Sequence, residues 1–471
     1  MTFLNELEQR IGQQHVLTGQ SMQQYLEDWR GRYTGTALAV ARPASTEELA
    51  QVVRLCAEHR VPVVPQGGNT GLCGGATPDN SGTALVLSLE RLNKIRSVDT
   101  DNDTMVVEAG CILQNVQQAA RDHQRLFPLS LAAEGSCTIG GNLATNAGGT
   151  QVLRYGNARD LTLGLEVVTA QGEILHGLLG LRKDNTGYDL RNLFIGSEGT
   201  LGIITAATIK LYPQPVAACT ALLALDTIED AVQVLALARQ GLAASLTGFE
   251  LIAGNCLQAV LHCYPDQRMP FQGPAEKSAW YALLELSDSE SLEHARERFE
   301  SVIGEALERG LVQDAVIAET IAQSKALWHL RESIPLAEKA YGKSIKHDVS
   351  IPVSVMSQFV HETDKALQEA FPGLENVTFG HLGDGNLHYN VARGTAFTEE
   401  ELLKRQDEIY ALVHDSVHRF HGSISAEHGV GQLKRQLLPR YKDPVSLNLM
   451  KQIKLALDPL GIMNPGKVLP D

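Results

Sequence analysis

Three glycine-rich loops in the first half of the chain constrain its fold more strongly than any other feature. They cover residues 65–75, 135–149 and 195–203. Glycine tolerates positive φ and lets a ligand approach the backbone closely, and backbone N–H groups freed in such loops form a nest that suits a pyrophosphate. A glycine-rich surface turn explains one such loop equally well. Three of them indicate a single extended ligand, a large flat group that carries phosphates.

The pattern around these loops predicts two kinds of domain. No G-x-G-x-x-G motif joins a strand to a helix, so the Rossmann signature is absent. A strand expected over 205–211 ends at Tyr212-Pro213-Gln214-Pro215, which marks a domain boundary. Beyond this point strands and helices alternate, which favours an α+β domain whose antiparallel sheet is covered by helices. The expected strands cover 220–225, 279–286 and 344–352, and the expected helices cover 229–240, 292–309 and 399–420.

A histidine-bearing hairpin is the second informative feature. In residues 377–391, two apolar, β-branched runs flank Gly383-Asp384-Gly385-Asn386, which has the composition of a turn. With these four residues as the loop, His381 pairs with His388, and the two imidazoles lie side by side on one face of the sheet. Asn390, two residues beyond His388, shares that face. Two adjacent imidazoles suit two ligands of one metal ion.

Two ordinary histidines beside a turn explain this stretch about as well, so a metal site needs a third ligand. Glu427-His428-Gly429 supplies a carboxylate and an imidazole on a glycine-bounded turn. Two histidines and one carboxylate leave coordination positions open for a substrate, which is the catalytic rather than the structural pattern of metal binding.

Composition narrows the class of protein. The 471 residues, 44% of them apolar and 20% charged, are typical of a soluble globular enzyme of about three domains. A net charge of −15 argues against nucleic acid or an anionic membrane as a partner. The first residues lack a basic segment followed by a long apolar run, and no stretch approaches 18 consecutive apolar residues, so neither a signal peptide nor a membrane-spanning helix is expected. Seven dispersed cysteines without a C-x-x-C pair predict reduced, buried thiols, and the expected compartment is the cytoplasm.

Taken in order along the chain, these motifs closely resemble one family. The three glycine clusters, the hairpin, Glu427-His428-Gly429 and Asn464-Pro465-Gly466-Lys467 are similar to the vanillyl-alcohol-oxidase/p-cresol-methylhydroxylase flavoproteins. The nearest branch holds the D-2-hydroxyglutarate and D-lactate dehydrogenases and the glycolate oxidase D subunit. The resemblance runs from about Pro43 to Lys467.

The family implies an α+β fold with a two-part FAD-binding domain of the p-cresol-methylhydroxylase type. Residues 1–215 would form that domain, and residues 216–420 a substrate-binding cap domain with an antiparallel sheet that carries the metal hairpin. Residues 421–471 would form a helical segment that returns to the flavin and completes the active and FAD sites.

The resemblance also implies roles for individual residues. It places Pro65, Gly67, Gly68, Asn69, Thr70 and Gly71 at the FAD pyrophosphate; Gly135, Ser136, Gly140, Gly141, Asn142, Thr145 and Asn146 at the flavin and its ribityl chain; Glu198, Gly202 and Ile203 at the adenosine; and Asn464 at the flavin. It makes His381, His388 and Glu427 ligands of a divalent ion, zinc or manganese, and His428 the residue that takes the substrate hydroxyl proton. Arg331 and Lys346 match residues that bind substrate carboxylates, and Asn390 and His428 would also contact the substrate.

The implied activity is the FAD-dependent, metal-assisted oxidation of a D-2-hydroxy acid to the 2-oxo acid, with hydride transferred to flavin N5. D-2-Hydroxyglutarate is the first choice of substrate, D-lactate and D-malate are the alternatives within the family, and a metal-dependent hydrolase of a nucleotide is the remote alternative. One departure weakens the first choice, because Pro335 stands where D-2-hydroxyglutarate dehydrogenases often carry threonine. Lys346 favours a dicarboxylate. The expected partners are a small 2-hydroxy acid, a separate electron acceptor (a quinone or an electron-transfer flavoprotein) and a second copy of the chain, without nucleic acid.

Thr138 predicts that FAD is bound without a covalent bond, because relatives often carry histidine at the matching position. Acid precipitation of the purified protein should therefore release all of the flavin into the supernatant, as measured by its absorbance. Yellow colour that stays in the washed pellet would contradict this prediction.

Overall fold

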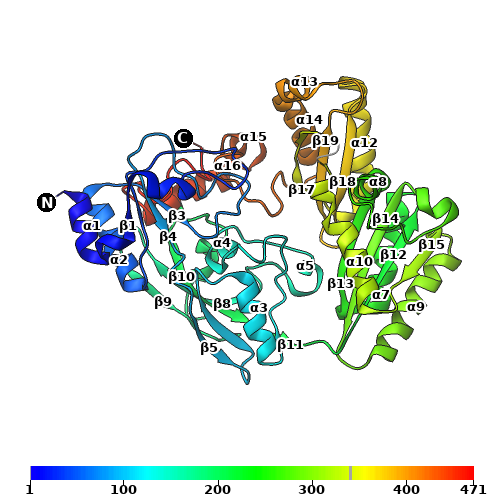
Figure 1. Ribbon diagram of the computed structural model, residues 1–471, viewed down its shortest axis with the longest axis horizontal. Helices are drawn as coiled ribbons and strands as arrows, with labels where there is room; N and C mark the ends of the chain where they lie inside the picture. The colour runs from blue at the N-terminus through cyan, green and yellow to red at the C-terminus, as the bar shows by residue number, and fades with distance from the viewer. Residues whose placement is uncertain (1, 339–341, 471) are drawn as a thin grey trace. The chain divides into compact units, whose positions relative to one another are not determined.

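The computed structural model describes residues 2–338 and 342–470, and the chain divides into two compact units (Figure 1). Unit 1 consists of residues 1–149, 156–214 and 427–471, and unit 2 consists of residues 150–155 and 215–426. Each unit is therefore assembled from segments that are far apart in the sequence.

The first sheet of unit 1 is mainly parallel. β2 (Ala39–Ala41), β4 (Leu85–Ser88) and β3 (Val63–Gln66) pair in parallel in that order, and β1 (Val16–Leu17) pairs antiparallel with β2. The helix α2 (Thr46–His59) supplies the crossover that a parallel pair requires. It begins after Ser45, whose side chain accepts a hydrogen bond from the Glu48 N–H, as an N-cap does.

The second sheet of unit 1 is antiparallel, in the order β5-β6-β10-β8-β9. Its strands are β5 (Ile95–Asp99), β6 (Thr104–Glu108), β10 (Ile203–Lys210), β8 (Thr162–Val168) and β9 (Ile174–Gly177). A short pair joins β7 (Arg125–Leu126) to β11 (Tyr212–Pro213). The other helices of unit 1 are α1 (Phe3–Ile11), α3 (Leu113–Asp122), α4 (Ile139–Ala144), α6 (Arg191–Phe194), α15 (Leu438–Tyr441) and α16 (Pro444–Leu457).

The C-terminal segment returns to the edge of the first sheet. Met463 bridges Val63 in parallel. The Val63 N–H donates to the Ile462 carbonyl, and the Asn464 N–H donates to the Val63 carbonyl, both at 2.8 Å. Ile462 and Met463 also belong to the apolar core between this sheet and its helices. These bonds bring Asn464 next to the strand that leads into the first glycine-rich loop.

Unit 2 is built on an antiparallel sheet, which confirms the sheet predicted for the cap domain. Its order is β15-β12-β14-β13-β18-β19-β16, and β17 also pairs with β19. The strands are β12 (Ala217–Leu225), β13 (Leu246–Ala253), β14 (Trp280–Asp288), β15 (Asp314–Ile317), β16 (Ser344–Ile345), β17 (Asp348–Ser350), β18 (Glu375–His381) and β19 (Asn386–Ala392). The helices are α5 (Val152–Tyr155), α7 (Ile228–Leu242), α8 (Gly254–Cys263), α9 (Leu292–Glu308), α10 (Ile321–Glu332), α11 (Ile334–Ala337), α12 (Met356–Ala370), α13 (Glu399–Lys404) and α14 (Gln406–Arg419).

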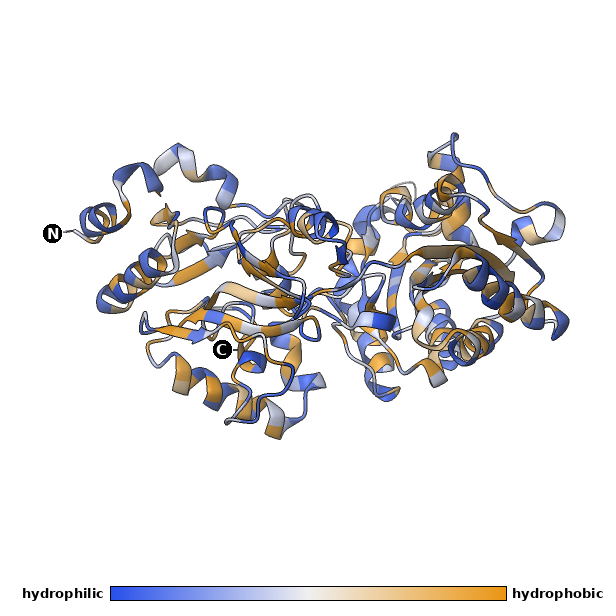
Figure 2. Ribbon diagram, turned by 90° about the horizontal axis from the view of Figure 1, so that it is seen from below, coloured by the Kyte–Doolittle hydropathy of each residue, from blue (hydrophilic) through white to orange (hydrophobic). Residues whose placement is uncertain are grey.

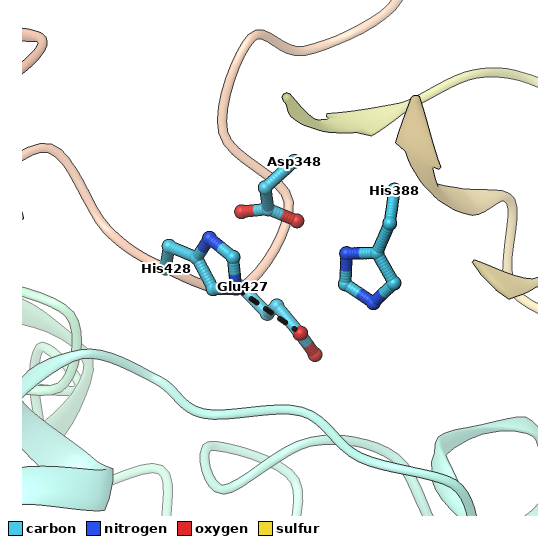
Figure 3. Close-up of side chains that lie close together, drawn as sticks. All are labelled: Asp348, His388, Glu427 and His428. Atoms are coloured by element: carbon cyan, nitrogen blue, oxygen red, sulfur yellow. Dashed lines mark ion pairs between the residues drawn. The ribbon is translucent and has the colours of Figure 1, made fainter. Parts of the chain in front are cut away.

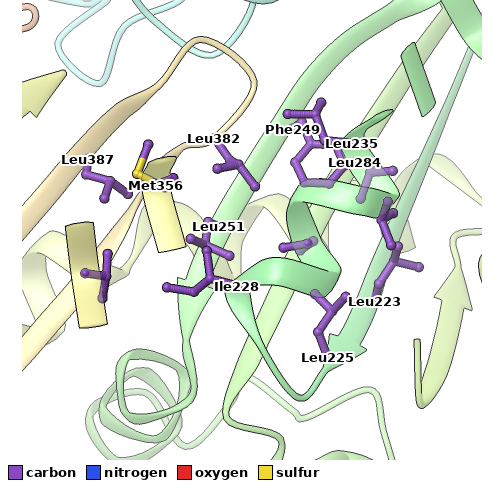
Figure 4. Close-up of a cluster of buried hydrophobic side chains, with 14 of the residues drawn as sticks. Leu223, Leu225, Ile228, Leu235, Phe249, Leu251, Leu284, Met356, Leu382 and Leu387 are labelled. Atoms are coloured by element: carbon purple, nitrogen blue, oxygen red, sulfur yellow. The ribbon is translucent and has the colours of Figure 1, made fainter. Parts of the chain in front are cut away.

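Helices cover both faces of this sheet, so its central strands are buried on both sides. Leu223 and Leu225 belong to an apolar cluster that also includes residues of α7, α9, α12 and α14; Figure 4 shows part of this cluster, with Ile228 and Leu235 of α7 and Met356 of α12. Leu222 and Ala224, which point the other way because side chains alternate along a strand, pack with residues of α8, α10 and α11. The strands accordingly read as nearly continuous apolar runs, and many helices alternate between polar and apolar residues (Figure 2).

The histidine hairpin forms, but its predicted register is wrong. His381 pairs with Asn386 and His388 pairs with Phe379, so the loop is Leu382 to Gly385 rather than 383–386. Gly385 adopts a φ of 85° and supplies the left-handed conformation that closes the turn. The partner of each histidine is displaced by two residues, and a displacement of two preserves the face on which a side chain lies. His381 and His388 therefore still share one face, although they are diagonal rather than directly opposed.

The strand predicted over 344–352 is divided into β16 and β17, and both pair with β19. The single helix predicted over 399–420 is likewise broken at Arg405, between α13 and α14. None of the seven cysteines, all of which lie in the described residues, forms a disulfide, but Cys263 is exposed rather than buried. Within the described residues, no helix has both the length and the apolar character that crossing a membrane requires.

Candidate active site

A pocket in unit 1 is lined by all three glycine-rich loops. The lining residues are Pro65, Gln66, Gly67, Gly68, Asn69, Thr70, Gly71, Cys73, Gly75 and Ala76 from the first; Thr138, Gly140, Gly141, Asn142, Ala144 and Thr145 from the second; Phe194, Ser197, Glu198, Gly199, Gly202, Ile203 and Ile204 from the third; and Leu89 and His428. The structure thus brings together most of the residues that the sequence assigns to the cofactor.

Close packing explains why these loops need glycine. A Cβ at Gly140 would lie 2.6 Å from the Ala109 Cβ, and one at Gly68 would lie 2.0 Å from the Ser136 carbonyl oxygen. A Cβ at Gly67 would lie 2.4 Å from the Thr138 Oγ1. Glycine at these positions lets the segments that surround the pocket pack directly against one another.

Thr138 provides a polar contact for a ligand in this pocket. Its hydroxyl is buried, lines the pocket, and has no hydrogen-bond partner within the described residues. Buried hydroxyl groups are normally satisfied, so this position fits a ligand with hydrogen-bonding groups. The donor chemistry and the bare backbone together fit the polar chain and ring system of FAD.

Three predicted cofactor residues of the second loop, Gly135, Ser136 and Asn146, are not among the residues that line the pocket. The Ser136 carbonyl packs against Gly68. Asn146, at a φ of 51°, accepts a hydrogen bond from the Arg159 N–H at 3.0 Å. At Gly135, an added Cβ would lie 3.5 Å from the Oε1 of the Gln114 side chain.

Glu198 ties the C-terminal segment of unit 1 to the third loop. Its carboxylate accepts hydrogen bonds from the Val430 N–H at 2.6 Å and the Gly431 N–H at 2.8 Å. Burial raises the pKa of Glu198 despite these bonds. The Asn464 side chain, predicted to contact the flavin, donates to the Glu198 carbonyl at 2.7 Å and to the Gly75 carbonyl at 2.9 Å. Asn464 is not among the lining residues and holds two of the loops together.

This attachment positions His428, which lies two residues before Val430 and lines the pocket. Its Nε2 is 3.6 Å from the Oε1 of Glu427, the ion pair drawn in Figure 3. The histidine predicted to take the substrate proton therefore borders the pocket that fits the flavin.

On unit 2, His388 lies beside a carboxylate that sequence reasoning missed. Asp348 is its register partner on β17, and the two residues offer ligand atoms within 4.8 Å of each other (Figure 3). The Asp348 carboxylate accepts hydrogen bonds from the Asn386 side chain at 3.0 Å and the Ala426 N–H at 3.2 Å. Glu427 follows Ala426 directly in the chain, so Asp348 holds the backbone that leads to the predicted ligand Glu427. Pairing β17 with the hairpin from the sequence would have identified Asp348.

A second missed carboxylate, Glu250, lies between two predicted site residues. Its Oε1 is 2.5 Å from the His381 Nδ1, and its Oε2 accepts a hydrogen bond from the Arg331 Nε at 2.8 Å. Burial alone would raise the pKa of Glu250, but the contacts of its carboxylate with His381 and Arg331 hold that pKa at about 2. Glu250 is the one charged residue in the apolar strand Leu246–Ala253. A charge in such a strand is the signal that could have identified it, because buried charges need partners.

The other predicted substrate cation is also paired with a buried carboxylate. The Lys346 Nζ donates to the Glu338 Oε2 at 2.5 Å, and the Asn390 side chain donates to the Glu338 Oε1 at 2.7 Å. The structure thus brings Lys346 and Asn390 together through Glu338, which sequence reasoning also missed.

The clash at Gly140 yields a prediction about cofactor retention. Overpacking of this size costs about 1–3 kcal/mol, so Gly140→Ala should weaken FAD binding by roughly tenfold. The matched control is Gly135→Ala, since a Cβ there meets only the tip of the Gln114 side chain at 3.5 Å and lies outside the pocket lining. The measurement is the ratio of flavin to protein absorbance after dialysis. Equal flavin retention in both variants would contradict the prediction.

Comparison with known proteins agrees with this geometry. The family described as FAD linked oxidases, C-terminal domain, matches residues 214–468, and the family described as FAD binding domain matches residues 37–177. The protein named D-2-hydroxyglutarate dehydrogenase from Xanthomonas citri pv. viticola is 42% identical over 447 residues, which are 95% of this chain and 92% of the relative. The mitochondrial protein of the same name from Rattus norvegicus is 40% identical over 444 residues, 94% of this chain and 80% of the relative.

Solved structures agree on the fold. A structure of p-cresol methylhydroxylase with substrate bound matches with a TM-score of 0.78 and 19% identity, covering 100% of this chain and 96% of that one. An alkyldihydroxyacetonephosphate synthase matches with a TM-score of 0.74 and 17% identity, over 98% and 84% of the two chains. These matches concern the fold alone. The family matches do not favour the nucleotide hydrolase considered from the sequence, and the chain belongs to the FAD-linked oxidases as an FAD-dependent oxidoreductase.

Proposed function

We propose that this protein oxidises D-2-hydroxyglutarate to 2-oxoglutarate. The observation that carries the proposal is the similarity of about 40% over 94–95% of the chain to relatives named D-2-hydroxyglutarate dehydrogenase. D-Lactate and D-malate are the alternative substrates, because the sequence departs from the dehydrogenase pattern at Pro335.

The chemistry requires a hydride acceptor and a base. Bound FAD supplies the acceptor, at flavin N5. His428, at the border of the FAD pocket, takes the hydroxyl proton on an imidazole nitrogen as carbon 2 is oxidised. The 2-hydroxy acid thus loses one hydride and one proton and becomes the 2-oxo acid.

In this proposal, Arg331 and Lys346 of unit 2 bind the two carboxylates of the substrate. Arg331 offers a planar fork of N–H groups that matches a carboxylate. Lys346 and Asn390, which meet at Glu338, provide a second polar group suited to the distal carboxylate of a five-carbon diacid. Fixing both ends of the substrate sets the direction in which carbon 2 presents its hydrogen.

We further propose that His381, His388 and Glu427 bind one divalent ion, zinc or manganese, and that Asp348 adds a fourth donor. Imidazole and carboxylate ligands suit both metals. Such an ion supplies positive charge that stabilises a deprotonated hydroxyl. The support is the donor chemistry on unit 2, where His388 adjoins Asp348, and the attachment of the chain before Glu427 to Asp348.

Three further proposals concern the electron acceptor, the oligomeric state and the cellular compartment of the enzyme. A separate acceptor, a quinone or an electron-transfer flavoprotein, would reoxidise the flavin, and the chain would form a homodimer. Dispersed cysteines that form no disulfide favour the cytoplasm as the compartment. Reoxidation assays with each acceptor class, light scattering of the purified protein and cell fractionation test these three proposals.

The substrate proposal is tested by anaerobic reduction of the enzyme-bound flavin with a panel of D-2-hydroxy acids. D-2-Hydroxyglutarate should bleach the flavin spectrum with the highest kcat/KM of the panel. Faster reduction by D-lactate would overturn the dicarboxylate assignment, and no reduction by any acid would overturn the proposed reaction.

The same assay tests the role of Lys346. A charge-assisted hydrogen bond contributes roughly 1.5–3 kcal/mol, so Lys346→Met should lower kcat/KM for D-2-hydroxyglutarate by about one to two powers of ten. The loss for D-lactate should be small, because D-lactate has no distal carboxylate. Lys343→Met, which changes an exposed lysine nearby, is the matched control. Equal losses for both acids would place Lys346 at the shared carboxylate instead.

The metal proposal predicts that chelation abolishes turnover while FAD stays bound, since the pocket-lining residues are separate from His381, His388 and Asp348. His388→Ala should lose both the metal, measured by elemental analysis, and activity. Full activity in His388→Ala would show that this histidine is not a required ligand.

A further inference from the structure

We infer that Glu250 is a positioning residue that orients the substrate-binding arginine and the metal-binding histidine through one shared carboxylate. The inference rests on the proposed function, because that proposal assigns these roles to Arg331 and His381. All three residues belong to unit 2, so their contacts lie within one compact part of the chain.

The position of Glu250 suits this role. It lies on β13, which pairs with the hairpin strand β18 through Leu251 and Gly380. The Glu250 side chain is completely buried, and its two oxygens bond to different elements, one to His381 on β18 and the other to Arg331 on α10. A buried carboxylate with two partners has little freedom to move, so it fixes both partners relative to the sheet.

Glu250 sets the proton position on His381. A carboxylate accepts hydrogen bonds and donates none when ionised, so the Nδ1 that faces it carries the proton. The other ring nitrogen, Nε2, then keeps its lone pair and can bind a metal ion. This carboxylate–histidine arrangement is the usual way in which proteins orient a metal-binding imidazole.

Glu250 also sets the plane of the Arg331 guanidinium. It engages the Nε–H, and the guanidinium lies 4.8 Å from the centre of the Phe379 ring. A guanidinium held by a hydrogen bond at Nε and by a cation–π contact with an aromatic ring has a restricted orientation. The N–H groups of the two terminal nitrogens are then aimed in set directions, which is what recognition of a carboxylate requires.

The replacement that separates positioning from packing is Glu250→Gln. Glutamine has nearly the same shape, but its amide offers one accepting oxygen and one donating nitrogen. It can accept a hydrogen bond from Arg331 or from His381, whereas its nitrogen opposes the N–H of the other residue. At least one of the two orientations is therefore lost while the volume of the side chain is kept.

The matched control is Glu285→Gln, on the neighbouring strand β14. The Glu285 carboxylate accepts hydrogen bonds from the Trp328 Nε1 at 2.7 Å and the Thr247 Oγ1 at 3.2 Å. Neither partner has a proposed role in binding or chemistry. Glu285→Gln thus disturbs a carboxylate network of the same sheet without touching Arg331 or His381.

The test compares both variants, as FAD-loaded enzymes, with the unmodified protein on the acid that the unmodified protein oxidises best. Glu250→Gln should raise KM roughly 10- to 100-fold and lower metal retention by a similar factor after dialysis against a competing chelator. Its flavin content should match that of the unmodified protein. Glu285→Gln should leave KM and metal retention within about twofold and change only the thermal midpoint.

Unchanged KM and metal retention in Glu250→Gln would overturn the inference, and so would equal losses in Glu285→Gln. If Glu250→Gln does not fold, KM and metal retention are measured in Glu250→Asp instead, because the shorter side chain keeps the charge but cannot reach both Arg331 and His381. An Asp variant with the KM and metal retention of the unmodified protein would also overturn the inference. Since the assay uses whichever acid is oxidised best, failure of the D-2-hydroxyglutarate assignment leaves this test intact.

Discussion

The buried carboxylate of Glu198 is the interaction on which the organisation of unit 1 depends. It accepts two backbone hydrogen bonds from Val430 and Gly431, more than 230 residues later in the chain. The Gln432 N–H adds a bond to the Cys73 carbonyl in the first loop. Together with the side-chain bonds of Gln432 to the Gly74 carbonyl and of Asn464 to the Gly75 and Glu198 carbonyls, these contacts hold the C-terminal segment against the loops, where His428 borders the pocket. A buried carboxylate that accepts two backbone hydrogen bonds thus links two segments that are distant in the sequence.

Local chemistry explains which parts of the fold and the site could be predicted from the sequence. The pocket was predictable because each glycine-rich loop shows its own glycine cluster in the sequence, and the structure explains several of these glycines by close packing, as at Gly67, Gly68, Gly140 and Gly199. The cap sheet was predictable because its strands are short apolar runs separated by amphipathic helices. His428 was predictable from its place in a motif shared with the family.

The parts of the site that the sequence did not predict depend on residues that are far apart in the chain and meet only in the folded structure. Glu250 is 81 residues from Arg331 and 131 residues from His381, and no local pattern joins them. The same holds for Asp348 and His388, which meet because two strands pair. The hairpin register was mispredicted because turn composition alone does not distinguish Leu382–Gly385 from 383–386. The Asn464 Nδ2 joins two loops, a role that its motif does not indicate, and its predicted contact with the flavin stays a prediction.

The two-residue displacement in the hairpin bears on how such a loop can change in length during evolution. A strand presents alternate residues to each face, so a change of two residues returns His381 and His388 to the same side of the sheet. A single residue inserted into or deleted from β19 between the loop and His388 would send that imidazole to the opposite side of the sheet. Within the strand, insertions and deletions should therefore be tolerated only in pairs, whereas the loop Leu382–Gly385 can change in length without moving either histidine to the other face. Because side chains alternate between the two faces of a strand, only an even number of added or removed residues keeps a histidine on its side of the sheet.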